Sequence, residues 1–541
     1  MATNFSAWAT SSGEIPQKIL NEVNPLTRGS YRLDPNLIDV DAKIVALIAQ
    51  GDYRHRQIFE LIQNAADAIL EDSKLTGGGR VKIVLSQNGL YCANEGAPFS
   101  LEGFKALRYP IGSAKNGPQA NGNQIGRYGH GFKSVLAITK KPYIYSRSGS
   151  FFYCFENVVD YLSEHVDDGH KDLPESRFGT VNKPKVSIFA IAKSIDPKSA
   201  AAEDQILEEM MGWATTVIFL PFEEDWYYTD KPPFDHLKKE IETFPSSFLV
   251  FTGHVCRLDL EIHDVEKFNP RSFYCEIKSS MTVVPQIRGG AEKFGDNKLQ
   301  IRVCSLMQEG DPKANDWVVF KDENVRIPEE IGKTGVQTNR RIDEENGRYL
   351  DVEVSWAVKL DLLLNRRGEF WFHFPTKDWT SLSGILNAPW DTNNERTTVF
   401  EGPFNDYLIE RASHLVHQSM PELVKFFGDD LGKIFDLVPA RQAEAEGIAR
   451  LLARRIPELA HTYATIPDLD GRFTLPADLR RYPSKLLAMD LEFASALARE
   501  WSEVKGSPRN FPHWSCISSQ NRSARLANWL RTEIETGENR E

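Results

Sequence analysis

The sequence has few cysteines and lacks the segments that export or membrane insertion requires. Its six cysteines lie far apart with no CxxC pair, so neither a disulfide framework nor a zinc site is indicated. No apolar run reaches the roughly eighteen residues of a membrane helix, and no basic start followed by an apolar stretch marks a secretory signal. These absences predict a cytoplasmic protein that makes no contact with a membrane.

Positive charge is also scarce. The chain has 64 Lys and Arg residues against 76 Asp and Glu residues, a formal net charge of −12. Nonspecific nucleic-acid binding depends on basic side chains that neutralise phosphates, so such binding is not indicated beyond a local groove. Apolar residues make up 41% and charged residues 26%, as in globular proteins. At 541 residues the chain exceeds one ordinary core, which predicts about two to four domains.

Apolar periodicity predicts where the first core begins. The first 35 residues are polar and contain Gly, Ser and Pro, so the core is expected to start near Leu37. Helices are expected over 37–50 and 54–72, and the second ends before three glycines at 77–79, which a helix tolerates poorly.

A hairpin and further strands are expected to follow these helices. Residues 81–85 and 90–93 alternate with a strand period on either side of Asn88-Gly89, a dipeptide typical of tight turns. The polar, glycine-rich segment 112–131 is expected to be a long functional loop. The remaining strands of this α+β unit are expected at 143–145, 151–155, 185–190 and 216–220. Mixed structure is expected as far as residue 423, followed by helices that include 444–456 and 486–501.

The helix over 54–72 has one face that carries chemistry. With about 100° per residue, Asn64 and Asp67 fall close to Glu60 on one stripe. The opposite stripe is apolar and would pack on the core. An ordinary amphipathic helix with a solvated polar face is the alternative interpretation.

Two glycine-containing segments are candidate ligand-binding elements. Residues 126–134, GRYGHGFKS, precede an apolar run that can continue as a helix, so backbone amides at its start would face an anion. The segment is not a P-loop, because Phe132 separates Gly131 from Lys133 and no buried strand precedes it. Asn94-Glu95-Gly96 ends the hairpin, where a ligand could lie against it. A purely structural turn is the alternative for both segments.

In this order, the motifs ExxxNAxDA, NxG and GxxGxGxKS resemble those of the GHKL ATPases, the superfamily of gyrase, heat-shock chaperones, histidine kinases and MutL. The segments ELIQNAADA, NEGAPFS, IGRYGHGFKSVLAIT and TVIFLPF are most similar to sacsin-like, chaperone-like bacterial members, with the likeness strongest over 53–221. The resemblance implies a Bergerat-type sandwich of helices on a mixed sheet in residues 1–225. An α/β transducer-like domain would follow in 226–423, and a mainly helical region in 424–541.

The resemblance also implies roles for individual residues, with ATP and Mg²⁺ as cofactors. Glu60 would be the general base that activates water, Asn64 would bind Mg²⁺, and Asp67 would support the nucleotide pocket. The other nucleotide-binding positions would be Asn94, Glu95, Gly96, Ser113, Lys115, Gly126, Tyr128, Gly129, His130, Gly131, Phe132, Lys133 and Thr216. Lys133 would lie near the phosphates or pair structurally, and Thr216 would sit under the adenine.

One position departs from the family pattern. The superfamily's DxGxG motif uses its Asp to accept from the adenine amino group, and Asn94 stands there in this chain, with Glu95 beside it and Pro98 at the second glycine. An Asn oxygen can accept the same hydrogen bond, more weakly than a carboxylate does. Either Asn94 or Glu95 is therefore the candidate adenine reader.

Two features of the later chain complete the expectations. Arg396 is expected to reach the γ-phosphate, because relatives carry an arginine in this region; a surface ion pair with Glu395 or Glu401 is the alternative. His414 and His417 are spaced to share a metal, but no acidic or Cys partner is evident nearby, so paired surface or core histidines are favoured.

The function implied by the resemblance is a Mg-dependent ATPase. Closure of a lid over 112–124 and dimerisation would act on an unknown client, in a homodimer or in a larger complex, with a role in bacterial antiviral defence. The alternatives are a non-hydrolysing ATP-binding sensor or scaffold and a protein histidine kinase. The kinase is disfavoured because only a short polar segment precedes the ATPase motifs, where a phospho-accepting His helix would be needed.

Overall fold

The chain divides into two compact units. The computed structural model describes residues 5–10, 12–50, 56–108, 132–223, 233–263, 270–284, 298–335, 349, 351–360, 367–393, 396–439, 447–480, 482, 493, 496–497, 499–500 and 510–535. The first unit comprises 1–275 and 306–313, and the second comprises 276–305 and 314–541. Strands β10 and β11 each contain residues of both units.

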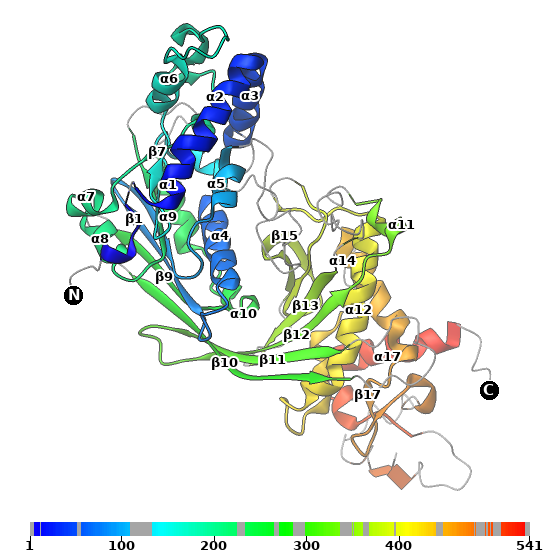
Figure 1. The fold of residues 1–541 in the computed structure, drawn as a ribbon. Helices are drawn as coiled ribbons and strands as arrows, with labels where there is room; N and C mark the ends of the chain where they lie inside the picture. The colour runs from blue at the N-terminus through cyan, green and yellow to red at the C-terminus, as the bar shows by residue number, and fades with distance from the viewer. Residues whose placement is uncertain are drawn as a thin grey trace. The chain divides into compact units, whose positions relative to one another are not determined.

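The first unit places helices on a mixed sheet (Figure 1). Its main helices are α1 (Glu14–Lys18), α2 (Asn24–Leu33), α3 (Asn36–Gln50), α4 (Gln57–Glu71), α5 (Leu101–Arg108), α6 (Phe155–Ser163), α7 (Pro197–Ala202), α8 (Gln205–Met211), α9 (Phe234–Glu242) and α10 (Phe248–Phe251). Its strand order is β10-β9-β1-β2-β8-β3-β4-β7. These strands are β1 (Gly79–Ser86), β2 (Gly89–Asn94), β3 (Tyr143–Ser146), β4 (Phe151–Phe152), β7 (Lys193–Ser194), β8 (Thr216–Pro221), β9 (Val255–His263) and β10 (Arg271–Val283).

Local patterning was sufficient for the central elements of this unit. The helices expected over 37–50 and 54–72 are α3 and α4, and the expected hairpin is β1–β2. The two residues between these strands are Gln87 and Asn88, so Gly89 is the first residue of β2. Glycine is needed at position 89 because a Cβ atom there would lie 2.6 Å from the Leu220 carbonyl oxygen of β8.

The first unit extends beyond residue 225, where the ATP-binding region was expected to end. Strand β9 pairs in parallel with β1 over almost its whole length, and β10 pairs antiparallel with β9. Because β9 and β10 are hydrogen-bonded into this sheet, the first continuous part of the unit extends to Cys275.

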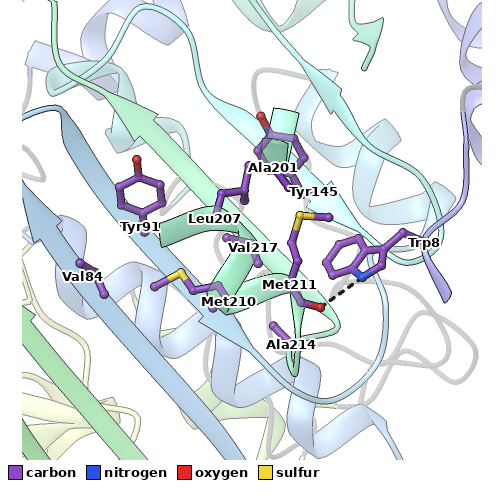
Figure 2. Close-up of a cluster of buried hydrophobic side chains, with 11 residues drawn as sticks. Trp8, Val84, Tyr91, Tyr145, Ala201, Leu207, Met210, Met211, Ala214 and Val217 are labelled. Carbon is purple, nitrogen blue, oxygen red and sulfur yellow. Dashed lines mark hydrogen bonds between the residues drawn. The ribbon is translucent and has the colours of Figure 1, made fainter. Parts of the chain in front are cut away.

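The expectation that the core starts near Leu37 was wrong. The Trp8 side chain is only 3% exposed and packs with residues of β1, β2, β3, α7, α8 and β8. Figure 2 shows its indole Nε1 donating to the Met211 carbonyl oxygen, a bond of 3.3 Å. One tryptophan in a polar segment gives no periodicity, so the sequence pattern could not reveal this contact.

Two expected strands were also misjudged. The strand expected over 151–155 ends at Phe152, because Cys154 caps the start of α6 by accepting from the Asn157 N–H. The segment 185–190 contains a 3₁₀ helix, Ile188–Ala190, instead of a strand. Its apolar residues are buried, Val186 and Ala190 in a cluster with Tyr31 and Ile38, and burial alone produced the strand-like run.

The second unit combines an antiparallel-rich mixed sheet with helices. Its strands are the later part of β10 and the earlier part of β11 (Leu299–Gln308), with β12 (Asn315–Val325), β13 (Val352–Lys359), β14 (Gly368–Phe372), β15 (Phe374–Thr380) and β16 (Ile385–Asn387). Its principal helices are α12 (Pro403–Val424), α13 (Ile434–Leu437), α14 (Gly447–Leu459) and α17 (Gln520–Glu535). The helix expected over 444–456 is α14, whereas most of 486–501 lies outside the described residues.

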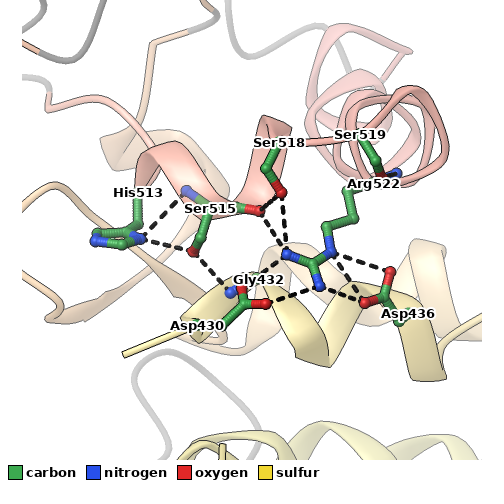
Figure 3. Close-up of polar contacts among 8 residues, drawn as sticks. All are labelled: Asp430, Gly432, Asp436, His513, Ser515, Ser518, Ser519 and Arg522. Atoms are coloured by element: carbon green, nitrogen blue, oxygen red, sulfur yellow. Dashed lines mark hydrogen bonds and ion pairs between the residues drawn. The ribbon is translucent and has the colours of Figure 1, made fainter. Parts of the chain in front are cut away.

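Buried charge pairs join the elements of the second unit. Arg411 of α12 pairs with Asp322 of β12, and both side chains are buried. Arg522 of α17 binds both Asp436 and Asp430 and also donates to the Ser515 carbonyl oxygen at 3.0 Å (Figure 3). Because these carboxylates and the guanidinium satisfy one another, they hold α17 against residues 430–436.

These observations establish a mixed α/β architecture with a mixed sheet, in agreement with the expected α+β class. Within the described residues, no helix is both long and apolar enough to cross a bilayer.

We predict that Trp8→Ala destabilises the first unit by about 3 to 5 kcal/mol, since it removes a buried aromatic side chain and leaves a cavity. Thermal unfolding followed by circular dichroism measures the effect. Leu26→Ala in the same segment is the control, because Leu26 is 64% exposed. Equal melting temperatures for the two variants would contradict the burial of Trp8.

Candidate functional site

Helix α4 places the three candidate residues against the sheet. It packs on β1 and β2, and a Cβ added to Gly79 of β1 would lie 2.8 Å from its Ile69 side chain. Glu60 is 4% exposed and Asp67 is 1% exposed, while Asn64 is half-buried. The alternative of a solvated polar face is therefore wrong for the two carboxylates. Acidic side chains are seldom buried without a role in pairing or function.

Gly96 allows the chain to approach the backbone of α4. Its φ is +104°, and a Cβ there would lie 2.5 Å from the Ala68 carbonyl oxygen. The next residue, Ala97, donates its N–H to that oxygen at 2.8 Å. The segment after β2 is thus fixed directly beside Asp67, and only glycine fits at position 96.

A row of polar side chains crosses three strands on the sheet face turned to α4. Asn94 of β2 pairs with Thr216 of β8, which pairs in turn with Ser146 of β3. Their neighbours Ala93, Val217 and Tyr145 belong to the Trp8 cluster on the other face. All three polar side chains are buried. The row therefore lies on the same sheet face as the helix that carries Glu60, Asn64 and Asp67.

Ser146 was missed by the sequence analysis. Its hydroxyl lies 3.1 Å from the Thr216 hydroxyl and accepts the Phe99 N–H at 2.9 Å. It thereby connects the segment after Gly96 to the start of β8. Only the register of β3 on β8 brings it there, and one serine in a strand carries no signal of its own.

Asn94 and Glu95 point to different partners. The Glu95 carboxylate accepts the Arg80 N–H of β1 at 2.8 Å, so it is bound to the sheet backbone. The Asn94 amide donates from Nδ2 to the Glu95 carbonyl oxygen at 2.6 Å. This bond engages the amide nitrogen and fixes the direction in which the acceptor atom, Oδ1, points.

Lys133 lies in a buried network of charges. Its ammonium donates to the Ala106 carbonyl oxygen at 3.3 Å and interacts with the Asp41 carboxylate. Asp41 also accepts from the Tyr31 hydroxyl at 2.7 Å and lies 3.6 Å from the Arg108 guanidinium. Burial lowers the pKa of Lys133 from 10.5 to about 8, although Asp41 acts in the opposite direction. These contacts correspond to the structural pairing that the sequence left open for this lysine.

The same network joins elements on either side of the glycine-rich segment. Arg108 ends α5 and also donates to the Thr27 hydroxyl of α2 at 2.9 Å, whereas Lys133 lies in the 3₁₀ helix Phe132–Ala137. Phe132 packs on Phe189, with ring centroids 6.1 Å apart. The other candidates of this segment lie outside the described residues: Ser113, Lys115, Gly126, Tyr128, Gly129, His130 and Gly131.

In the second unit, Arg396 is not a surface residue. It is 3% exposed, its φ is +54°, and its guanidinium lies over the Phe372 ring, 5.2 Å from the centroid. Arg396 therefore does not take the surface position that the alternative interpretation gave it. A cation stacked on an aromatic face keeps its charge while the ring fixes its direction.

The two histidines of α12 are core residues, as favoured from the sequence. His417 donates from Nε2 to the Ile456 carbonyl oxygen at 2.7 Å, and burial lowers its pKa to about 3. His414 is bound to Tyr463 and to Glu410. Across the described residues, no cluster of three or more His, Cys, Asp or Glu side chains could hold a metal ion.

The donor set of α4 suits a hard cation that is shared with a ligand. Asn64 offers one amide oxygen, and carboxylates of Glu60 and Asp67 lie within one turn of it on the helix. Mg²⁺ commonly takes only one or two protein oxygens and completes its shell with water and substrate phosphates. The oxygen donors of this helix are therefore of the kind that Mg²⁺ accepts.

No protein-family model matches the sequence, and comparison with curated proteins gives no significant match. The fold and the site thus define the chain as a mixed α/β protein with a buried acidic helix on its sheet.

We predict that Lys133→Met alters the pH dependence of stability. Between about pH 8 and 10.5 the unfolded parent holds a proton that the folded parent has lost, so its free energy of unfolding rises with pH in this window. Below pH 8 both states are protonated and this contribution is constant. Urea unfolding of the first unit, measured across the window, gives the free energy of unfolding at each pH. The value for the parent should rise relative to the value for Lys133→Met as the pH increases.

The exposed Lys105 of α5 provides the control, and Lys105→Met should keep the parental slope. A Lys133→Met protein with the same slope as the parent would contradict the lowered pKa.

Proposed function

We propose that the chain is a Mg-dependent ATPase of the GHKL type, with its first unit as a Bergerat-type sandwich. The observation that carries the proposal is the packing of α4, with buried Glu60 and Asp67, over the sheet face on which Asn94 and Thr216 are neighbours. At these same positions the chain resembles the motifs of the superfamily. These residues are far apart in the sequence but lie on or against one sheet face, which supports the proposal of a common nucleotide site.

The proposed chemistry assigns one task to each residue. Glu60 accepts a proton from the attacking water, and its burial keeps competing water away from that step. Asn64 offers its amide oxygen to Mg²⁺, which when bound offsets the charge of the nucleotide phosphates. The Asn94 Oδ1 accepts from the adenine amino group, because its Nδ2 is already used within the loop.

Several further parts of the proposal follow the family resemblance. A lid over 112–124 would close on ATP, the chain would dimerise or join a larger complex, and the motion would act on a client in bacterial antiviral defence. Arg396 would stabilise charge on the γ-phosphate, for which a buried, stacked guanidinium is chemically suited. A non-hydrolysing ATP sensor is the alternative function, and the presence of Glu60 on α4 favours hydrolysis over it.

We predict that Glu60→Ala retains Mg·ATP binding but loses turnover by about a hundredfold or more, because a general base acts in the chemical step. Calorimetry measures binding, and phosphate release measures turnover. Glu71→Ala is the matched control, since Glu71 is an exposed carboxylate at the end of the same helix. Unchanged turnover in Glu60→Ala would remove Glu60 from the mechanism. A parent that binds ATP without releasing phosphate would favour the sensor.

For the base pocket, we predict that Asn94→Ala weakens ATP binding about fivefold, which is the value of one neutral hydrogen bond. Glu95→Ala should change affinity less, because its carboxylate is bound to the Arg80 N–H. Calorimetric titration of both variants with ATP and with GTP tests the order. The opposite order would identify Glu95 as the adenine reader.

A further inference from the structure

The first turn of α4 is capped by a residue from a distant helix. The first N–H groups of a helix lack partners within it, and the residue that precedes α4, Arg56, provides no side-chain cap. Glu240 of α9 fills this role: its Oε1 accepts the N–H of Ile58 at 3.1 Å and that of Phe59 at 3.4 Å. The residue after Phe59 is Glu60.

Glu240 is buried more deeply than a capping side chain needs to be. It is 8% exposed, and its second oxygen, Oε2, is buried without a hydrogen-bond partner in the described part of the chain. Burial raises its pKa to about 8, and the nearby Glu60 charge acts in the same direction, against the effects of Arg56 and the two N–H groups. A buried carboxyl that is only half satisfied costs stability, so capping for stability alone does not account for it.

Glu240 caps the part of α4 that leads directly into Glu60. The cap fixes the two peptide groups that lead into Glu60, whose own N–H donates to the Arg56 carbonyl oxygen at 3.0 Å as the first bond of the helix. The Phe59 ring is held at the same time by Phe244, just after α9, with centroids 5.1 Å apart. The rate of proton transfer falls steeply when the general base is displaced even slightly from its position beside the attacking water.

We propose that Glu240 is a positioning residue for Glu60: its carboxyl cap on Ile58 and Phe59 sets the place from which Glu60 reaches the attacking water. The inference rests on the proposed ATPase function and adds a residue outside its motifs. Glu240 belongs to α9, which leads through α10 and β9 to β10, the strand that passes into the second unit.

The test compares three substitutions in the full-length protein. Glu240→Gln keeps an oxygen that can accept both N–H groups, and we expect kcat within about twofold of the parent. Glu240→Asp is too short to reach them and Glu240→Met has no acceptor, so we expect kcat to fall about tenfold to a hundredfold with the Kd for Mg·ATP unchanged. Phosphate release gives kcat, calorimetry gives Kd, and circular dichroism shows whether each variant is folded.

Two controls separate positioning from general damage. Glu242→Gln changes an exposed acid on the same helix and should leave kcat as in the parent. In a Glu60→Ala background, Glu240→Asp should cause no further loss, because the cap acts only through Glu60. A structural role would lower residual turnover in both backgrounds and would weaken ATP binding as well.

The outcomes distinguish the inference from the function beneath it. A parent that releases no phosphate contradicts the proposed ATPase function. If the parent hydrolyses ATP and the folded Glu240→Asp protein has the parental kcat, the role of Glu240 is contradicted. The proposed ATPase function is then unaffected. If Glu240→Met does not fold, the contrast between Glu240→Asp and Glu240→Gln decides.

Discussion

The packing of α4 on β1 and β2 is the constraint on which the rest of the first unit depends. The helix lies so close to the segment after β2 that a Cβ atom is excluded at Gly96. Its burial removes Glu60 and Asp67 from water, and it packs on the sheet face that carries the polar row formed by Asn94, Thr216 and Ser146. A shift of this helix would therefore disturb the candidate base, the turn after β2 and the sheet face together.

Buried charge serves different ends in the two units. In the second unit, Arg522 is matched by Asp430 and Asp436, so its charge is satisfied and its role is to hold α17 in place. In the first unit, Lys133 and Glu240 have pKa values displaced toward the neutral form, because burial outweighs their partners. Such incomplete compensation costs stability, and proteins tend to retain it where a functional site requires it.

The sequence predicted the elements whose signals are local. Helices α3 and α4, the β1–β2 hairpin and β8 follow from apolar spacing, and α4 also from the glycines after it. Prediction failed where a feature depends on distant contacts. Trp8 is buried by α8 and β8, and the run 185–190 is buried without being a strand. Burial makes a segment apolar whatever its backbone conformation, so such a run does not specify a strand.

For the candidate site, the sequence by itself determined that Glu60, Asn64 and Asp67 share one side of a helix, because the turn of an α-helix is a local property. The tertiary structure decided that the two carboxylates of this side are buried, and it added Ser146 and Glu240. Ser146 reaches Thr216 across 70 residues of sequence, and Glu240 reaches the Ile58 N–H across 182. Strand register and helix packing create such contacts, and no periodicity along the chain encodes them.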